Sequence, residues 1–359
     1  MNEPLRLALV GGPMYDAVYE TFGDDVAIVV QADHLSLNAR VAELLAAGER
    51  IDVLATHGKY APSQRRWLHP LDDLLSPATV GSLAPGAVEL CRHRGELLCA
   101  PRNIDVRVLW WRSDRLAAPP DTWSELLASD AVFGFTGRGS GLFGLFYELL
   151  VGAGGRLFDP DGAPALERDA ATEAITMLAA LGARGPRALT TWHYDEVDDA
   201  LASGAVDAAA AWPGATALLR GASVPLRAAA YPAGPRRRVS YSGCHGWAIP
   251  RTCGDLDAAV AFVERLCSAE THRIDASLGS IPARTDVLRS LAPVDEVDAE
   301  RLEVTRRTID ASMITYPALE RFPELEDAGV AALGGVLTRS TGVAAAVETI
   351  CAALATVTT

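Results

Sequence analysis

The chain has 359 residues, of which 49% are apolar and 22% charged, a composition typical of a globular protein long enough for two domains. Its formal net charge of −14 would repel phosphate backbones, which argues against nucleic-acid binding as the main role. No apolar run reaches the roughly 18 residues that cross a bilayer, so we expect no membrane-spanning segment. The ligand that we expect is a small molecule.

The first part of the chain alternates segments typical of strands with segments typical of helices. The pattern predicts strands at residues 5–12, 26–32 and 51–58, with helices at 13–22 and 35–48 between them. Strands that alternate with helices in this way form βαβ units, so we expect a largely parallel sheet.

Two features mark the ends of the second predicted helix. Asp33 or Ser36 can cap its N-terminus, because a short oxygen-bearing side chain accepts hydrogen bonds from the first free amide groups. Gly48 stands where such a helix would end.

A second α/β region follows from about Thr122 on. Its pattern predicts strands at 131–137 and 206–214, and helices at 142–155 and 171–181. The last part of the chain is rich in alanine and predicts a helical tail. No period of 20 to 50 residues recurs, which excludes repeat architectures.

The most informative stretch spans residues 95–127. It places a short strand, an acid, an apolar strand and a proline-rich helix start in a fixed order, at Gly95–Pro101, Asn103–Asp105, Val108–Arg112 and Pro119–Leu126. Further blocks follow in the same order at residues 139–166, 200–219, 241–251 and 278–288. Together they resemble family 1 of the extracellular solute-binding proteins of ABC importers, the maltose-binding type.

The resemblance implies an α/β, periplasmic-binding-protein-like fold of two hinged lobes, each a mainly parallel sheet flanked by helices. Both lobes would be discontinuous, with residues 1–106 and 250–310 in lobe 1 and residues 107–249 and 311–359 in lobe 2. It further implies a monomer that encloses a small polar solute, above all a carbohydrate or polyhydroxylated compound, in an interlobe cleft. The partner would be an ABC permease if the chain is exported, and no cofactor is implied.

Loops after the early strands are the first candidate ligand contacts, because open α/β sheets bind ligands at the carboxyl ends of their strands. This rule favours Tyr15, Asp33 and His57. The resemblance adds Asn103 and Asp105, which stand where the family has an acid or amide. A carboxylate suits sugar hydroxyls because it offers several acceptor sites. For Asp105 a helix cap or a hinge ion pair is an equal alternative.

Tryptophans form the second group of candidates. Trp192, Trp212 and Trp247 can offer an aromatic face to the apolar C–H face of a sugar, although a tryptophan is more often a packing residue. Trp110 and Trp111 are neighbours in a strand and face opposite ways, so at least one should lie in the core.

The resemblance places three more residues near the ligand, namely Tyr241, His245 and Arg284. Arg284 can instead anchor an ion pair, and we consider this the better interpretation. Ser140 is a further candidate, since the free amide groups of a helix N-terminus bind polar ligand oxygens.

The same helix start raises a nucleotide hypothesis. Residues 139–144 fit the glycine spacing of a dinucleotide-binding turn, with Asp159 at the expected distance. The stretch before Asp159 is a poor strand, however, because glycines interrupt it. Glycines that let a helix pack closely on a strand explain the motif as well.

Catalytic and metal-binding patterns are sparse. Cys244 and His245 are the alternative catalytic candidates, together with Asp105, but neighbours in an extended chain point apart and make a poor nucleophile and base. Cys91, His93 and Cys99 match no zinc spacing, so we expect no metal site.

An enzyme built on the solute-binding fold is the rival hypothesis, a biosynthetic lyase, hydrolase or transferase inside the cell. The first sixteen residues lack the apolar core of a secretory leader, and the six dispersed cysteines favour free thiols and a reducing compartment. As written, the chain would stay in the cytoplasm, whereas the resemblance implies an extracytoplasmic protein.

Overall fold

The computed structural model describes residues 3–159 and 161–358, which form two compact units. Unit 1 comprises Met1–Asp105, Gly243–Ala292 and Ala318–Phe322, and unit 2 comprises Val106–Ser242, Pro293–Pro317 and Pro323–Thr359. In the described part of the chain, no helix combines the length and the apolar character needed to span a bilayer.

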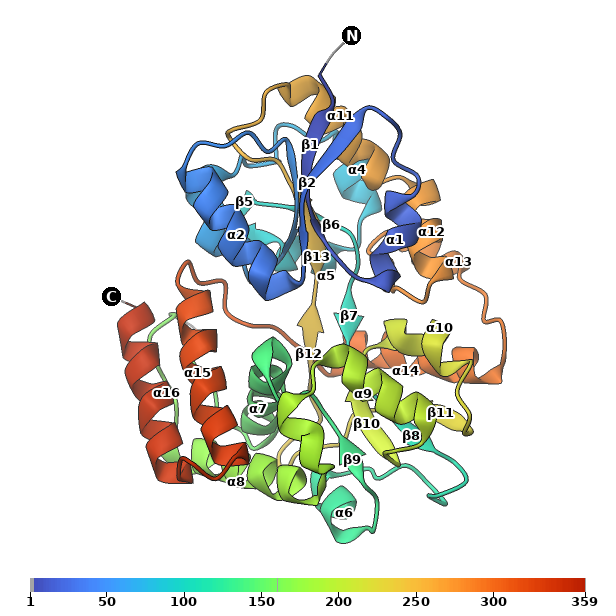
Figure 1. Ribbon diagram of the computed structural model, residues 1–359, viewed down its shortest axis with the longest axis vertical. Helices are drawn as coiled ribbons and strands as arrows, with labels where there is room; N and C mark the ends of the chain where they lie inside the picture. Colours follow the sequence, from blue (N-terminus) through green and yellow to red (C-terminus); the bar gives the residue numbers. More distant parts are fainter. Residues whose placement is uncertain (1–2, 160, 359) are drawn as a thin grey trace. The chain divides into compact units, whose positions relative to one another are not determined.

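Unit 1 is built around a five-stranded sheet in the order β2-β1-β3-β13-β6. Figure 1 shows helix α2 on one face of this sheet and helices α1 and α12 on the other. Its elements are β1 (Leu5–Val10), α1 (Pro13–Tyr19), β2 (Val26–Ala32), α2 (His34–Ala46), β3 (Val53–His57), α3 (Ala61–Gln64), η1 (Arg65–Trp67), α4 (Pro77–Ser82), α5 (Pro85–Leu90), β4 (Arg92–His93), β5 (Glu96–Leu97), β6 (Ala100–Pro101), β13 (His245–Ala248), α11 (Leu256–Leu266), α12 (Ala269–Ser277) and α13 (Thr285–Ser290).

Unit 2 contains a four-stranded sheet in the order β11-β8-β10-β9. Its elements are β8 (Val108–Arg112), α6 (Trp123–Ala128), β9 (Phe133–Gly134), α7 (Gly139–Gly152), α8 (Arg168–Arg184), η2 (Arg187–Thr191), α9 (Tyr194–Ser203), β10 (Ala208–Ala211), η3 (Pro213–Ala215), α10 (Thr216–Leu219), β11 (Leu226–Ala229), α14 (Glu296–Ala311), β14 (Met313–Ile314), α15 (Phe322–Leu337) and α16 (Val343–Val357). Strands β7 (Asp105–Val106) and β12 (Ser240–Gly243) carry the chain from one unit to the other and join β14 in a small third sheet.

The predicted elements of the first part of the chain are confirmed. Strand β1 pairs in parallel with β2 and with β3, as the βαβ pattern indicates. The cap of α2 is Asp33, whose carboxylate accepts a hydrogen bond from the Ser36 amide at 3.1 Å. Gly48 follows the helix with φ +74°, a left-handed conformation that glycine adopts without strain.

The sheets are mixed rather than mainly parallel. In unit 1, β13 runs antiparallel to both β3 and β6, and in unit 2, β8 runs antiparallel to both β10 and β11. Strand β13 enters its sheet after the chain has passed through unit 2, without the helical crossover that makes consecutive strands parallel.

The unit boundaries differ from the lobe boundaries expected at residues 249/250 and 310/311. Helix α14 belongs to unit 2, where it packs on β11. The Arg227 Nε atom of β11 donates to Glu300 of this helix at 2.7 Å, and Glu296 also pairs with Arg227. These ion pairs join segments about 70 residues apart in sequence, which the local pattern cannot indicate.

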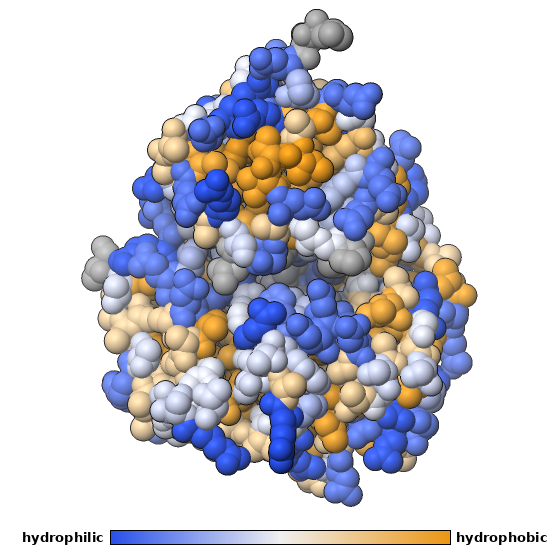
Figure 2. Space-filling view, in the orientation of Figure 1, coloured by the Kyte–Doolittle hydropathy of each residue, from blue (hydrophilic) through white to orange (hydrophobic). Residues whose placement is uncertain are grey.

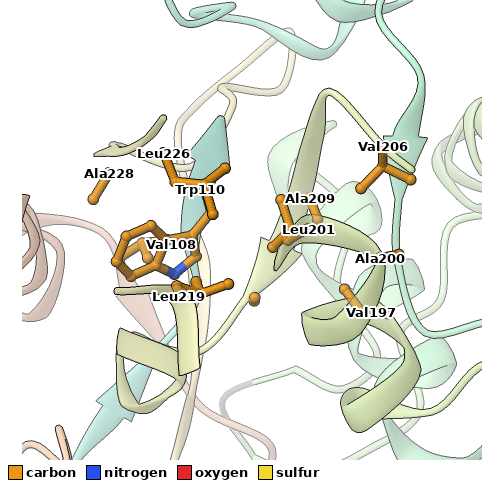
Figure 3. Close-up of a cluster of buried hydrophobic side chains, with 11 residues drawn as sticks. Val108, Trp110, Val197, Ala200, Leu201, Val206, Ala209, Leu219, Leu226 and Ala228 are labelled. Carbon is orange, nitrogen blue, oxygen red and sulfur yellow. The ribbon is translucent and has the colours of Figure 1, made fainter. Parts of the chain in front are cut away.

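The core of unit 2 includes Trp110, which is 0% exposed, so the expectation that one of the two neighbouring tryptophans is a core residue is confirmed. Trp110 pairs with Ala209 of β10 and with Ala228 of β11, so all three side chains share one face of the sheet. Figure 3 shows this face packed against Val197 and Leu201 of helix α9.

The edge of the unit 1 sheet is apolar on its solvent side. Strand β2 is the edge strand, and its Ile28 and Val29 side chains are 47% and 36% exposed. Figure 2 shows the corresponding apolar patch on the surface of unit 1. An exposed apolar edge strand is a surface that favours pairing with another chain.

A buried histidine makes unit 1 sensitive to acid. His272 of α12 is 1% exposed, and neither of its ring nitrogens has a hydrogen-bond partner. Burial, together with the positive charges of Arg284 and Arg102, lowers the pKa of His272 to about 3. The unfolded chain therefore binds a proton near the ordinary histidine pKa while the folded chain does not, and stability falls as the pH drops from about 6.5 toward 3.

We expect His272→Leu to flatten this acid dependence. Between about pH 7 and pH 4.5, the wild type should lose about 2–3 kcal/mol more unfolding free energy than the variant, as measured by urea unfolding. The control is His69→Leu, because His69 is only partly buried, whereas His272 is 1% exposed. Equal acid dependence of His272→Leu and wild type would contradict the assignment.

Candidate functional site

Polar side chains gather in unit 1 where its strands end. We call Tyr15, His57, Asn103, Asp105 and His245 the histidine cluster. Tyr15 lies in α1 just after β1, His57 is the last residue of β3, and His245 is the first residue of β13 and pairs directly with His57. Their positions follow the rule that open α/β sheets carry ligand contacts at the carboxyl ends of parallel strands.

The aromatic rings of this cluster touch one another. The His57 and His245 ring centroids are 5.2 Å apart, and the Tyr15 ring lies 5.5 Å from that of His245. The Tyr15 hydroxyl is 3.4 Å from His245 Nδ1. Burial raises the pKa of Tyr15 well above its usual value, although Arg102 opposes the shift. Tyr15 therefore stays a neutral hydroxyl that can both donate and accept.

Asn103 links His245 to Asp105 by two hydrogen bonds. Its Oδ1 atom accepts a hydrogen bond from the His245 amide at 2.9 Å, and its Nδ2 group donates to Asp105 Oδ2 at 2.6 Å. The Asp105 carboxylate is thereby oriented by a neutral donor. A carboxylate oriented in this way offers oxygen acceptors to hydroxyl groups.

A buried ion pair lies beside the Tyr15 ring. Arg102 donates to Asp275 through Nε at 2.8 Å and through NH2 at 2.5 Å, and both side chains are at most 5% exposed. The Arg102 guanidinium lies 4.8 Å from the Tyr15 ring centroid and 5.2 Å from that of Trp247. Sequence reasoning missed Arg102, because its role depends on Asp275, 173 residues away.

Unit 2 carries a second group, which we call the aromatic cluster: Tyr194, Trp212, Tyr241 and Tyr316. Their ring centroids follow one another at 6.0, 5.3 and 5.1 Å. Trp212 comes directly after β10, and Tyr194 begins α9. Trp212 and Tyr194 are partly exposed, whereas Tyr241 is 2% exposed. Tyr241 therefore lies on the buried side of the cluster, and Trp212 and Tyr194 lie on its accessible side.

Arg107 packs against two rings of the aromatic cluster. Its guanidinium lies 4.8 Å from the Tyr241 ring centroid and 5.6 Å from that of Trp212, within the range of cation–π attraction. Arg107 is balanced by Glu148, with NH1 and Oε2 3.4 Å apart. Burial raises the pKa of Glu148, and Arg107 partly opposes that shift.

A glycine of helix α7 allows the helix to pack closely against Arg107 and Tyr241. A Cβ atom at Gly144 would lie 2.4 Å from the Arg107 guanidinium and 2.5 Å from the Tyr241 ring. The Gly141 carbonyl accepts a hydrogen bond from Arg107 at 2.8 Å. Only glycine at position 144 allows the helix to approach these side chains so closely, which explains the glycine-rich motif by packing.

Most of the chain matches one family of known proteins. Residues 23–300 match the family described as bacterial extracellular solute-binding protein. The chain belongs to this family. The matching group is family 8 of these proteins, whereas the sequence resemblance pointed to family 1, so the broader assignment is the one confirmed.

Solved structures show that this solute-binding protein has the fold of the maltose-binding type. Maltose-bound MalE3 of T. maritima is 22% identical, with a TM-score of 0.86 over 98% of this chain and 99% of that one. A solute-binding protein of Agrobacterium radiobacter K84 in complex with ribitol is 18% identical, with a TM-score of 0.81 over 99% and 98% of the two chains.

A curated relative shares part of its length with this solute-binding protein. It is a probable amino-acid ABC transporter periplasmic-binding protein, y4oP, of Sinorhizobium fredii (strain NBRC 101917 / NGR234), 25% identical over 218 residues. The match spans 55% of this chain and half of that protein's length.

The other predicted ligand contacts of the solute-binding protein are placed as follows. The Ser140 hydroxyl is 3.4 Å from that of Tyr194, at the edge of the aromatic cluster. Trp192 packs against the core cluster around Trp110. Trp247 is 1% exposed and lies in β13, between β3 and β6 of the unit 1 sheet. These positions favour packing roles for the last two.

Two charged candidates of the solute-binding protein have local structural roles. Arg284 donates to Asp286 at 2.8 Å and to the Cys267 carbonyl at 3.0 Å, as expected for an anchoring ion pair. Asp33 caps helix α2 and is exposed. Tyr194 and Arg107 were missed, although Tyr194 lies two residues after the candidate Trp192.

The alternative site hypotheses gain no support from the described residues. Asp159 lies in a turn, where its Oδ1 atom accepts from the Asp161 and Ala163 amides, and no second strand precedes it. Cys244 Sγ lies beside Cys91, whereas the His245 ring lies beside Tyr15, so the two neighbours face apart as expected. Over residues 3–159 and 161–358, no group of three or more potential ligands is arranged to hold a metal ion.

Proposed function

We propose that this solute-binding protein captures a carbohydrate or polyol and delivers it to the permease of an ABC importer. The observation that carries the proposal is the aromatic cluster, in which a partly exposed Trp212 is fixed between Tyr194 and Tyr241 over Arg107. An indole held in this way presents a rigid apolar face, which matches the C–H face of a sugar ring.

The histidine cluster supplies the complementary polar groups. Asp105 offers an acceptor, Tyr15 offers a neutral hydroxyl, and the histidine rings can donate or accept. Hydroxyl groups need such mixed partners because each is both a donor and an acceptor. As the family resemblance implies, the two lobes would enclose the solute and close by a hinge motion, stabilised by contacts that each makes only in the closed state.

A neutral solute fits the charges better than an amino acid does. An amino acid would require a cation for its carboxylate, but Arg102 is engaged by Asp275 and Arg107 by Glu148. The curated relative is named for amino acids, so this alternative belongs in the test. Neutral hydroxyl-rich ligands need no additional charge.

A ligand panel tests the proposal. We expect maltose, maltotriose, ribitol or tagatose to raise the thermal unfolding temperature, since a ligand at 100 times its Kd stabilises the folded state by about 2.7 kcal/mol. Isothermal titration calorimetry would then give the Kd. Stabilisation by amino acids alone, with no response to any sugar or polyol, would contradict the proposal.

A further inference from the structure

Three buried cysteines of unit 1 lie together beside the histidine cluster. Cys91, at the end of α5, has its Sγ atom 3.5 Å from that of Cys244, and both side chains are at most 2% exposed. The Cys99 side chain also interacts with Cys91, and its Sγ atom lies 2.8 Å from the position that a Cβ atom of Gly246 would occupy. All three thiols are free in this structure.

The two chain segments that carry Cys91 and Cys244 are held close through their backbones. The Gly58 amide donates to the Cys244 carbonyl at 2.8 Å. A Cβ atom at Gly58 would lie 2.5 Å from the Leu90 carbonyl oxygen and 3.7 Å from that of Cys244. Gly58 therefore allows the residue before Cys91 and Cys244 itself to approach the same point, and the two Sγ atoms meet at 3.5 Å.

We propose that Cys91 and Cys244 are a disulfide-forming pair, oxidised by a low-molecular-weight disulfide such as oxidised glutathione. When local opening exposes the pair, one cysteine thiolate attacks the oxidant, forms a mixed disulfide and releases one glutathione thiol. The other cysteine thiolate then attacks the protein sulfur of the mixed disulfide and releases the second glutathione thiol. One disulfide bond is consumed, one is formed, and the two protein protons leave on the two glutathione molecules.

The crosslink connects α5 to the start of β13. Cys244 directly precedes His245, whose amide is bound by Asn103 and whose ring contacts Tyr15. A covalent bond at Cys244 thus restrains one end of the histidine cluster. It also closes a loop of about 150 residues, and long loops give the largest stabilisation in the chain-entropy description of disulfides.

Peptide mapping tests the pairing directly. The folded protein is incubated for hours with oxidised glutathione, unfolded in the presence of an alkylating reagent, digested and analysed by mass spectrometry. We expect one peptide pair linking Cys91 to Cys244, a loss of two hydrogens in the intact mass, and a rise in the unfolding temperature on the order of 5 °C. Reduction with dithiothreitol should reverse all three.

Cysteine variants supply the control. Cys91→Ala and Cys244→Ala should each abolish the crosslink, while Cys351→Ala should retain it, since Cys351 lies in helix α16 of unit 2. If the alanine variants fail to fold, the map of the wild-type protein still decides. A Cys91–Cys99 link as the main product, stable glutathione adducts, or six alkylated thiols after oxidation would overturn the proposal.

Discussion

Replacing Asp275 by alanine should destabilise unit 1 by about 3–5 kcal/mol, because it leaves the buried Arg102 charge without its carboxylate partner. Both hydrogen bonds from the guanidinium to Asp275 are lost, and Arg102 is only 4% exposed, so its charge stays buried. Tyr15 also loses the fixed cation beneath its ring. Urea unfolding measures the first effect, and solute affinity measures the second.

The matched control for this prediction is Asp286→Ala. Asp286 also pairs with an arginine of unit 1, Arg284, but its side chain is 56% exposed. Exposed ion pairs contribute about 0–1 kcal/mol, so this variant should remain close to the wild type. If the two substitutions cost the same, the buried pair would not be the support that the geometry indicates.

The parts of the fold that depend on local pattern could be predicted. Strands β1, β2 and β3 and helix α2 follow from hydrophobic alternation, and Asp33 and Gly48 mark the helix ends by their own chemistry. The direction of β13 could not be predicted, because it depends on where the chain re-enters unit 1 after about 140 intervening residues rather than on its own sequence.

The residues of the candidate site also divide into those that the local sequence indicates and those that depend on distant segments. A position near the end of a strand is visible in the sequence, and Tyr15 and His57 were predicted in this way, whereas Trp212 was predicted from its residue type. Trp247 has the same residue type but lies inside a strand between two paired neighbours, so it is buried. Arg107 was missed because its partners, Glu148 and Tyr241, come from distant segments, and only the packed structure shows that the three meet.

The aromatic cluster makes the largest prediction for solute capture. We expect Trp212→Ala to weaken binding of the best sugar or polyol by about 10- to 100-fold, since the loss of an aromatic contact surface costs about 1–3 kcal/mol. Calorimetric titration of wild type and variant measures the change. Stability should fall much less than for a core tryptophan, because Trp212 is partly exposed.

Two variants separate loss of contact from loss of structure. Trp212→Phe keeps a flat aromatic face and should recover most of the affinity. Trp192→Phe changes a tryptophan that packs against the Trp110 core cluster, and it should leave affinity within about 2-fold of the wild type while lowering stability slightly. If Trp212→Ala binds as tightly as the wild type, the indole face does not contact the solute. In that case the proposal that the aromatic cluster carries solute recognition is wrong, even though the family assignment remains.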